Sequence, residues 1–333
     1  MEEIQKLKSL LNKPQDVVIL SHRNPDGDAV GSSMGLAGFL QKLRHAVKVV
    51  FPSEYPGSFQ YIEGIDQAII FDINPQIARE AVQKATLIFC LDFNSLDRID
   101  KLGEAVKFST ALKVLIDHHL DPEPFAEFTL SDTAASSTSE LVYEFIKELD
   151  MLHIIDEMIG VALYTGIVTD TGSFKYATRP NTYHVAGFFK SMGVDDYQIQ
   201  NLIHNSLKEK HLRLLGHCLA NRMEVLGPVR SAIIHLTKED YKTFDIQRGD
   251  TEGIVNYLLM MKDIDVAVFV TEQPSIIKLS FRSKGDINVQ DLASSYFNGG
   301  GHKNASGGSA YAKLEDILDK VRRVLPYYVR KSN

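Results

Sequence analysis

The sequence predicts an α/β protein in which a doubly wound, mostly parallel sheet is followed by a second, smaller α/β domain across a cleft. Three observations predict this class. The chain has 333 residues, and at roughly 150 residues per domain this length suggests two domains. Short, almost wholly apolar runs alternate with helical patterns through the first half, as in parallel sheets covered on both faces. After residue 221 strand patterns return between helices, which indicates a second core.

The elements of the first domain follow from the spacing of apolar residues. Strands are expected where these runs are short and rich in β-branched residues, and helices where apolar residues recur every three to four positions. Residues 1–16 open with two glutamates and read as an amphipathic helix rather than an export signal. The predicted strands are 17–21, 47–51, 68–71, 86–92 and 113–117, with helices at 29–44 and from Pro75 onward.

The second half divides into a helical stretch and a strand-rich part. Residues 137–220 have an almost purely helical pattern, which completes the first domain and leads to the second. We therefore predict a first domain at 1–190, a helical linker at 191–219 and a second domain at 220–333. Its expected strands are 222–227, 229–236, 266–272 and 275–283, with helical patterns near 250–262, 289–297 and 313–325.

Composition excludes several classes of protein. Hydrophobic residues make up 44% and charged residues 24% of the chain, which is typical of a globular protein. The net charge of -7 gives no basic excess of the kind that binds long duplex nucleic acid. The longest apolar runs are too short to cross a bilayer, so no membrane partner is expected. The two cysteines, Cys90 and Cys218, read as buried thiols of a reducing cytoplasm.

Acidic residues and a histidine follow the first predicted strand. His22, Asp26 and Asp28 lie in a tight turn that leads into a helix, at the end of the strand where open α/β sheets bind ligands. Two carboxylates so close together repel unless a proton or a cation lies between them. The alternative is that Asp28 is a helix N-cap in an ordinary Asp-Gly turn.

Three further segments end in the same kinds of side chain. One predicted strand ends in Asp92, and another ends in Asp117, His118 and His119. Asp170 ends an apolar helical run and precedes a turn with glycine. Each alone is compatible with capping or surface positions. Together they place the same ligand chemistry at successive element ends, which favours one shared site.

The residue types narrow the choice of metal. Aspartates and histidines without a thiolate suit a divalent ion such as Mn²⁺ and are too rich in carboxylate for a structural zinc site. Two ions that share a bridging carboxylate, roughly 3.5–4 Å apart, clamp a phosphoryl group and lower the pKa of a water. The sequence therefore predicts two metal ions and hydrolysis of phosphoesters. Four aspartates and two histidines from these segments are the candidate ligands.

The second domain supplies an independent signal in a glycine-rich segment. Consecutive glycines let backbone N–H groups turn towards an anion, although a flexible surface loop is the alternative. Arg282 and Ser283 end a nearby strand and carry a guanidinium and a hydroxyl suited to phosphate. The alternative for Arg282 is an ordinary surface charge. The segment itself contains Gly299, Gly300, Gly301 and His302.

These motifs together resemble the DHH phosphoesterase superfamily, named for the triplet present at residues 117–119. The similarity runs through HRNPDGDAVGS, LDFNSLDR, DHH and TGIVTDTGSF, and FRS and GGGHKNASGG are similar to its glycine-rich C-terminal domain. The size of the chain, without extra domains, resembles the nano-RNase / pAp phosphatase group most. This resemblance implies a cytoplasmic enzyme with two Mn²⁺ ions. It also implies cleavage of RNA of roughly two to five nucleotides and removal of the 3′-phosphate of pAp.

The resemblance also implies a role for each site residue. One ion would be held by His22, Asp26 and Asp92, and the other by Asp28, Asp92, His118 and Asp170, with Asp92 as the bridge. His119 would lie beside the scissile phosphate, and Asp117 would orient the histidines. A second phosphate or terminal nucleotide of the substrate would contact Arg282, Ser283, Gly299, Gly300, Gly301 and His302.

Several alternatives stay open on sequence alone. Cyclic di-AMP or its linear product pApA is a close alternative substrate, and a manganese pyrophosphatase, a RecJ-type exonuclease and a nucleotide sensor with a decayed site are weaker ones. The chain departs from the family pattern at Phe93-Asn94 and at Leu120-Asp121-Pro122. These positions border the expected nucleotide path, so they bear on substrate preference. A homodimer through the first domain also stays open.

Overall fold

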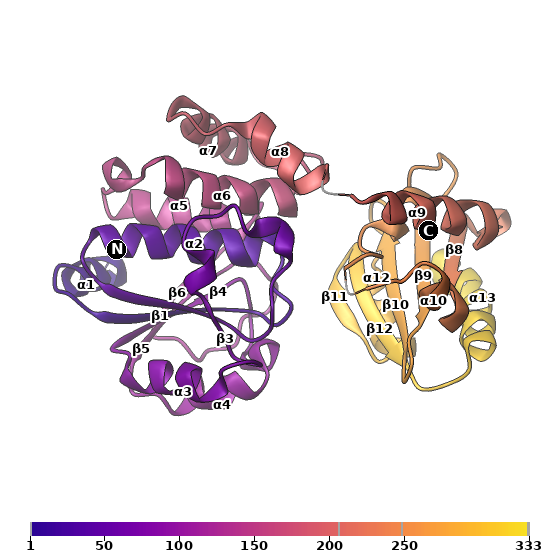
Figure 1. Cartoon of the computed structure of the whole chain (residues 1–333), viewed down its shortest axis with the longest axis horizontal. Coiled ribbons are helices and arrows are strands. Elements are labelled where there is room, and N and C mark those ends of the chain that lie inside the picture. The colour runs from indigo at the N-terminus through magenta and orange to yellow at the C-terminus, as the bar shows by residue number, and fades with distance from the viewer. Residues whose placement is uncertain (1, 206, 248, 332–333) are drawn as a thin grey trace. The chain divides into compact units, whose positions relative to one another are not determined.

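The computed structural model describes residues 2–205, 207–247 and 249–331. The chain divides into two compact units, residues 1–206 and 207–333 (Figure 1). The segment expected to be a linker, 191–219, is shared between them. Its first helix, α8 (Asp196–His204), belongs to the first unit, and α9 (Glu209–Asn221) belongs to the second.

The first unit is built on a six-stranded sheet in the order β3-β2-β1-β4-β5-β6, and all of its pairs are parallel. This confirms the predicted doubly wound fold. Along β1, Val17 and Ile19 pack on one face while Val18 and Leu20 pack on the other. Both faces are buried, and this explains why the strand is continuously apolar. The strands are β1 (Asp16–Ser21), β2 (Ala46–Phe51), β3 (Ile69–Ile70), β4 (Leu87–Leu91), β5 (Leu112–Asp117) and β6 (Phe128–Ser131).

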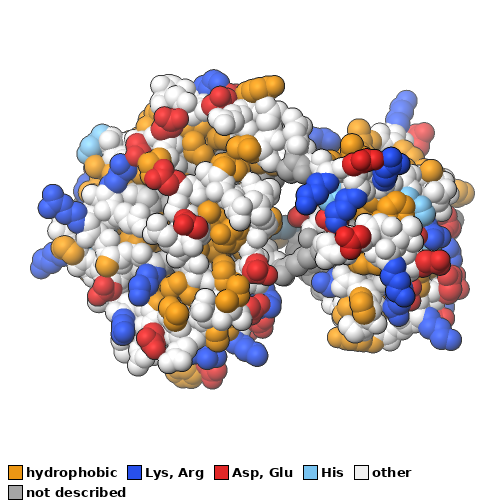
Figure 2. All heavy atoms as spheres, viewed as in Figure 1, with side chains coloured by type: hydrophobic (Ala, Val, Ile, Leu, Met, Phe, Trp, Pro, Cys, Tyr) orange, Lys and Arg blue, Asp and Glu red, His pale blue; other side chains and the backbone are white. Residues whose placement is uncertain are grey.

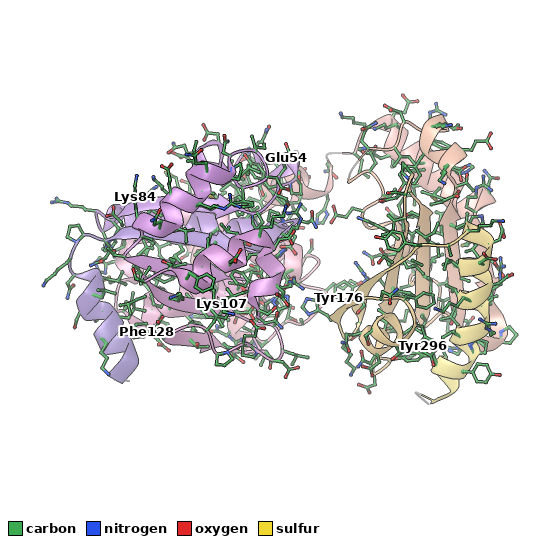
Figure 3. The ribbon with its side chains drawn as sticks, turned by 90° about the horizontal axis from the view of Figure 1, so that it is seen from below. Glu54, Lys84, Lys107, Phe128, Tyr176 and Tyr296 are labelled. Atoms are coloured by element: carbon green, nitrogen blue, oxygen red, sulfur yellow. The ribbon has the colours of Figure 1, made fainter. Side chains whose placement is uncertain are left out.

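Helices cover both faces of this sheet (Figure 1). Figure 3 shows Lys84 and Lys107 on the face that α3 and α4 cover, opposite α2. One face carries α1 (Glu2–Leu11), α2 (Gly27–Lys42), α5 (Thr138–Glu148) and α6 (Glu157–Asp170), with α7 (Pro180–Ser191) packed on α5 and α6, and the other carries α3 (Pro75–Lys84) and α4 (Lys101–Phe108).

The contact between α2 and α6 is unusually close because α2 presents glycine at every fourth position. A Cβ atom at Gly31 would lie 2.4 Å from the carbonyl oxygen of Ala162, and one at Gly35 would lie 2.5 Å from the Leu163 side chain. At Gly27 a Cβ would meet Thr169 at 2.4 Å. Only glycine permits this approach. It brings the start of α2 next to the end of α6.

The helix boundaries correct two expectations. The second helix begins at Gly27 rather than Ala29, because the Asp26 side chain accepts hydrogen bonds from the N–H groups of Asp28 and Ala29. Asp26 is thus the N-cap, and the alternative that gave this role to Asp28 is wrong. The helical pattern near 250–262 forms only the short helix α11 (Ile254–Leu258), and β6 was not predicted.

The second unit has a mixed six-stranded sheet in the order β11-β12-β10-β9-β8-β7. Only the β8–β9 pair is parallel among the described strands of this sheet. Helices α12 (Val289–Tyr296) and α13 (Leu314–Lys331) pack on one face, and α9, α10 (Lys238–Thr243) and α11 on the other. The strands are β7 (Met223–Leu226), β8 (Ser231–Leu236), β9 (Val266–Glu272), β10 (Ile277–Ser283), β11 (Gly300–His302) and β12 (Ala305–Ala310).

The glycine-rich segment of this unit is a β-hairpin and not a loop. Strands β11 and β12 pair antiparallel, with Lys303 and Asn304 between them. A Cβ at Gly299 would lie 1.9 Å from the carbonyl oxygen of Gly307, and one at Gly301 would lie 2.7 Å from that of Ala305. Two of the three glycines therefore permit close approach of the hairpin strands.

Surface charge bears on the binding of nucleic acid, and helix length bears on the spanning of a membrane. On the face shown in Figure 2, acidic and basic side chains are interspersed. Among the described residues, the helices are all too short or too polar to cross a membrane.

Candidate active site

Three neighbouring strands carry site residues at their carboxyl ends. His22 follows β1, Asp92 follows β4, and Asp117 is the last residue of β5. These strands are adjacent and parallel in the sheet, so their ends meet at one edge. His118 and His119 continue from β5 into the same place.

Two helices bring the remaining carboxylates to this edge. Asp26 and Asp28 lie at the start of α2, and Asp170 is the last residue of α6. The glycine contact described above holds these two helix ends together. The structure thus brings together all six residues that the sequence singled out as metal ligands.

The ligand atoms form two groups that meet at Asp92. In the first group, His22 Nε2 lies 3.4 Å from Asp92 Oδ2 and 3.8 Å from Asp26 Oδ1. His22 Nδ1 lies 2.9 Å from the carbonyl oxygen of Arg23, which accepts its proton and directs the Nε2 lone pair towards the carboxylates.

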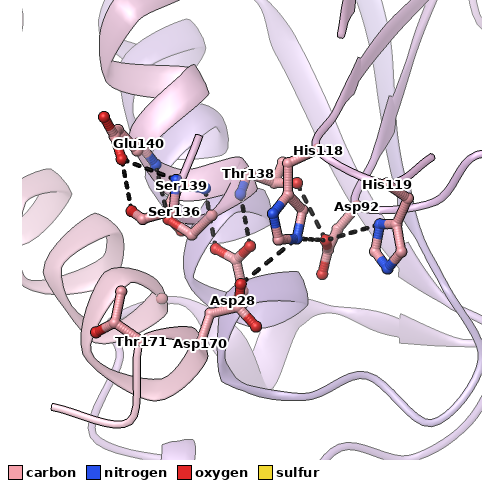
Figure 4. Close-up of polar contacts among 12 residues, drawn as sticks. Asp28, Asp92, His118, His119, Ser136, Thr138, Ser139, Glu140, Asp170 and Thr171 are labelled. Carbon is pink, nitrogen blue, oxygen red and sulfur yellow. Dashed lines mark hydrogen bonds and ion pairs between the residues drawn. The ribbon is translucent and has the colours of Figure 1, made fainter. Parts of the chain in front are cut away.

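In the second group, His118 Nε2 lies 3.4 Å from Asp170 Oδ2 and 3.6 Å from Asp92 Oδ1 (Figure 4). Ligand atoms of Asp28, His118 and Asp170 all lie within 4.8 Å of one another. Asp92 therefore contacts a histidine of each group, through a different oxygen each time.

These separations fit ions rather than direct hydrogen bonds. Metal bonds of roughly 2.0–2.2 Å at angles between 90° and 109° place two ligands of one ion about 2.8–3.6 Å apart. The His–Asp separations of 3.4 and 3.6 Å lie in this range and are long for hydrogen bonds, and the 3.8 Å between His22 and Asp26 lies slightly above it. The donors, imidazole nitrogen and carboxylate oxygen, are also those of divalent metal sites.

The N-terminus of α5 supports the carboxylates from the protein side. Thr138 N–H donates to Asp28 Oδ2 at 2.6 Å, and Ser139 N–H donates to Asp28 Oδ1 at 2.9 Å. The Thr138 hydroxyl donates to Asp92 Oδ1 at 3.0 Å (Figure 4). Helix N-termini favour negative charge, so they stabilise these aspartates. The sequence analysis missed both residues; the signal was the cap Ser137 followed three positions later by Glu140.

His119 belongs to a third arrangement. Its Nδ1 donates to Asp117 Oδ1 at 2.7 Å, and the Asp117 side chain is wholly buried. Ligand atoms of His119, His118 and Asp92 also lie within 4.8 Å of one another. The short bond to Asp117 already uses Nδ1, however, which favours a role for His119 at the substrate over a role as a ligand.

The crowded carboxylates shift the ionisation of the site. Burial, with the nearby charge of Asp92, raises the pKa of Asp28 well above its usual value and that of Asp170 to about 7. Burial lowers the pKa of His118, but the charges of Asp170 and Asp92 outweigh it and raise that pKa to about 9. Protons thus compensate the negative charge when no cation is bound. A divalent ion would displace them.

The candidate residues of the second unit lie on one edge of its sheet. The register pairs Arg282 with Ala305 and Ala305 with His302 across three neighbouring strands. Residues directly opposite each other share a face, so Arg282 and His302 flank the small side chain of Ala305. Ser283 points to the opposite face, and its hydroxyl donates to the carbonyl oxygen of Ile287 at 2.6 Å.

Comparison with known proteins agrees with this geometry. Residues 16–167 match the model of the DHH family, N-terminal domain, and residues 233–326 match that of the DHHA1 domain. A crystal structure of an exopolyphosphatase-related protein from Bacteroides fragilis is 37% identical and covers 99% of this chain and 97% of that chain, with a TM-score of 0.96. This chain belongs to the DHH phosphoesterase family. It is therefore a metal-dependent hydrolase of phosphoester bonds.

Two kinds of curated relative are about equally similar. The bifunctional oligoribonuclease and PAP phosphatase NrnA of Bacillus subtilis is 29% identical over 89% of this chain and 90% of that protein. The cyclic-di-AMP phosphodiesterase PdeA of Listeria monocytogenes is 26% identical over 94% of this chain. This DHH-family chain spans about half of the length of PdeA, 47%.

Proposed function

We propose that this chain is a Mn²⁺-dependent, two-metal phosphoesterase that hydrolyses short oligoribonucleotides to mononucleotides and removes the 3′-phosphate of pAp. The observation that carries this proposal is the position of Asp92 between two histidine-containing groups of ligand atoms. A carboxylate with one oxygen towards each group is the arrangement that two ions with a shared ligand require. The match to NrnA along most of both chains supports the substrate class.

In this proposal the two groups hold one ion each. Such ions, when bound, polarise a phosphoryl group and make a water acidic enough to attack at neutral pH. Mn²⁺ suits a site that is mostly carboxylate with some imidazole. The first ion is assigned to His22, Asp26 and Asp92, and the second to Asp28, Asp92, His118 and Asp170.

We assign His119 as the residue that donates a proton to the leaving oxygen. Because Asp117 accepts the Nδ1 proton at 2.7 Å, Nε2 is the nitrogen that exchanges a proton with the substrate. The buried Asp117 carboxylate also holds the His119 ring in one orientation, as a carboxylate behind a catalytic histidine does. Replacing Asp117 with Asn would weaken this hydrogen bond.

We assign the second unit to binding the part of the substrate that is not cleaved. Arg282 offers a cationic guanidinium and His302 an imidazole donor on one face of the sheet, with the small Ala305 between them. A terminal phosphate fits this pair of donors. Ser283 and Asn304 hold the neighbouring turn, because Asn304 Nδ2 donates to the Ser283 hydroxyl at 2.8 Å. Gly299 and Gly301 allow the two strands of the hairpin that carries His302 to approach each other closely.

Hydrolysis of cyclic di-AMP or of pApA is the second candidate. It is favoured by the similarity to PdeA, which is comparable to the similarity to NrnA. Both candidates use the same metal site and differ in the nucleotide that is held. The substrate panel below therefore includes both.

The test is the Mn²⁺-dependent rate of mononucleotide release from 5′-labelled RNA, from the dinucleotide to about two dozen nucleotides. Parallel reactions contain pAp, pApA or cyclic di-AMP. Asp92→Asn removes the charge of the shared carboxylate and should lower every rate by at least ~10³-fold, while the exposed Asp97→Asn is the matched control. Rates that fall steeply with length, with pAp cleaved, support the proposal. Rates that are flat or rise with length, or cleavage of cyclic di-AMP alone, contradict it.

The proposal also includes the cellular location and the oligomeric state of the protein. We assign it to the cytoplasm, because Cys90 and Cys218 are free, buried thiols in different units. A homodimer through the first unit completes the proposal, and light scattering during size-exclusion chromatography measures it directly.

A further inference from the structure

Arg179 is unusual because of where it lies in its helix. It is the N-cap residue of α7, a position where a side-chain oxygen normally accepts a backbone N–H bond. A guanidinium has no acceptor and cannot do this. Arg179 instead directs its side chain away from its own helix, which indicates that another interaction keeps an arginine here.

The Arg179 guanidinium joins three carboxylates. Nε donates to Glu140 Oε1 at 2.7 Å, Nη1 to Asp132 Oδ2 at 2.6 Å, and Nη2 to Glu144 Oε1 at 2.8 Å. Asp132 follows β6, while Glu140 and Glu144 belong to α5. One planar side chain therefore ties the start of α7 to α5 and to the loop before it.

Glu140 is the centre of this cluster, and its side chain is fully buried. Besides Arg179, its carboxylate accepts from Asn181 Nδ2 at 2.8 Å and from the Thr182 hydroxyl at 2.9 Å. It also accepts from the N–H of Ser136 at 3.0 Å and from the Ser136 hydroxyl at 2.5 Å. A buried carboxylate needs this degree of compensation, and Arg179 supplies the positive charge.

The segment that Glu140 holds is the one that supports the metal site. Ser136 is fixed by Glu140, and the Ser137 hydroxyl accepts from the Glu140 N–H at 3.0 Å. The next two residues, Thr138 and Ser139, donate to Asp28, as Figure 4 shows. The chain of contacts from Arg179 to Asp28 thus passes through one buried carboxylate and one helix N-terminus.

We propose that Arg179 is a positioning residue for the ion assigned to Asp28, His118 and Asp170. Arg179 neutralises Glu140, and Glu140 fixes the 136–139 segment whose N–H groups aim the Asp28 carboxylate. This inference rests on the proposed two-metal site. It adds a residue from a different helix, with no contact to an assigned ligand, that controls the affinity of one ion more than that of the other.

The two ions differ in their dependence on this cluster. Asp28 takes hydrogen bonds from the N–H groups of α5, whereas Asp26 takes them from the first turn of its own helix, α2. Metal–ligand distances tolerate errors of only about 0.2 Å. Loosening the 136–139 segment therefore displaces Asp28 and Oδ1 of the shared Asp92, which accepts from the Thr138 hydroxyl and lies on the His118 side. The contacts of His22 with Asp26 and with Asp92 Oδ2 do not depend on this segment directly.

The experiment measures Mn²⁺ binding to the full chain by calorimetry and by electron paramagnetic resonance. Arg179→Met should weaken one of two sites by about 10- to 100-fold, as outer-sphere substitutions do, and change the other by less than about threefold. Arg179→Lys keeps the charge but lacks the fork that joins three carboxylates, so it should weaken the same site by about 3- to 10-fold. Asp28→Asn identifies which site this is.

Arg222→Met is the matched control. Arg222 donates to Asp240 at 2.9 Å, and the Asp240 side chain is almost fully buried, as that of Glu140 is. The pair lies in the second unit, so this variant should lower thermal stability without changing Mn²⁺ affinity. Saturating Mn²⁺ should restore kcat to Arg179→Lys and leave Asp28→Asn impaired.

Each outcome decides between the inference and the function on which it rests. Wild-type affinity at both sites in Arg179→Met overturns the positioning role while the two-metal function stands. Equal weakening at both sites also overturns it. If Arg179→Met does not fold, unchanged binding in Arg179→Lys has the same meaning. If the wild-type chain binds no Mn²⁺, the proposed function itself fails.

Discussion

Substituting Gly31 by alanine tests whether the α2–α6 contact sets the geometry of the metal site. The added methyl group would lie 2.4 Å from the carbonyl oxygen of Ala162 and 2.8 Å from the nitrogen of Gly166. Both atoms belong to the backbone of α6, so no side-chain rotation relieves the clash. The two helices have to move apart.

The size of this movement follows from the distances. A tight but tolerable contact of about 3.2 Å requires the helices to separate by roughly 0.8 Å. Overpacking of this kind costs about 1–3 kcal/mol, and the better helix propensity of alanine offsets about 1 kcal/mol. We expect a net loss of up to about 2 kcal/mol, or a Tm lower by roughly 2–8 °C. The effect on metal binding is larger, because 0.8 Å exceeds the tolerance of metal bonds about fourfold.

The assay combines thermal unfolding with Mn²⁺ titration. Gly31→Ala should weaken the ion assigned to Asp28 and Asp170, since these residues come from the two separated helices. Gly187→Ala is the matched control, because it also lies within a helix and its Cβ would meet no atom within 4 Å. It should be neutral or stabilising. Wild-type Mn²⁺ affinity and Tm in Gly31→Ala would refute the reasoning.

Three further predictions concern the metal, the pH and the hairpin. Chelation of Mn²⁺ should lower the unfolding temperature of the first unit and leave that of the second unit unchanged. Mn²⁺ at about 100 times its Kd should restore about 2.7 kcal/mol of unfolding free energy. A single calorimetric transition that does not shift on chelation would disprove this. Burial raises the pKa of Asp240, but bonds from Arg222 and Thr237 lower it overall to about 2. The resulting stability is present above about pH 4 and is lost towards pH 2. The gap in unfolding free energy between wild type and Arg222→Met should therefore shrink over that range. Gly301 has a φ of 138°, and a Cβ atom there would lie 2.7 Å from the carbonyl oxygen of Ala305, so Gly301→Ala should distort the hairpin. This variant should raise the KM for pAp and leave the Mn²⁺ affinity unchanged.

The sequence predicts which side chains gather at this edge of the sheet because the candidate ligands follow local rules. Asp92 and His118 end apolar runs, and the carboxyl ends of parallel strands meet at one edge. Chain order alone does not say that β1, β4 and β5 are adjacent, but any doubly wound sheet brings such ends together. Aspartates and histidines at these ends could therefore be expected to gather without knowing the register, and the resemblance to the family then implied which six are ligands.

The supporting contacts could not be predicted because they join distant segments. Thr138 and Ser139 carry an ordinary capping signal, while their partner Asp28 lies 110 and 111 positions away. Arg179 has no local pattern at all. The same applies to the acidic partners of His211 and His217. These histidines lie 2.8 Å from Asp250 and 2.9 Å from Asp240.

The hairpin at 300–310 could not be predicted from the sequence for a different reason. Glycine disfavours strands, so the two glycines and two serines within ASGGSA at 305–310 argue for a loop. The segment is a strand because β10 offers six register partners to it, from Ile277 to Arg282. Tertiary pairing overrides local propensity here. The same close pairing is what places His302 on the face of Arg282.

Asp92 shows how the sheet is adapted to a site that carries several negative charges. Its φ of 64° lies in the left-handed region, which costs a residue with a side chain about 1–2 kcal/mol. This turn ends β4 and keeps the Asp92 N–H bonded to the carbonyl oxygen of Ile116 at 3.1 Å. A residue that continued the strand would point to one face of the sheet, where helices cover it. The left-handed turn instead directs the carboxylate over the strand ends, between His22 and His118. The backbone strain at Asp92 and the repulsion among the aspartates both destabilise the first unit when no metal is bound. A bound cation offsets the repulsion. The site and its metal are thus coupled through the stability of the first unit.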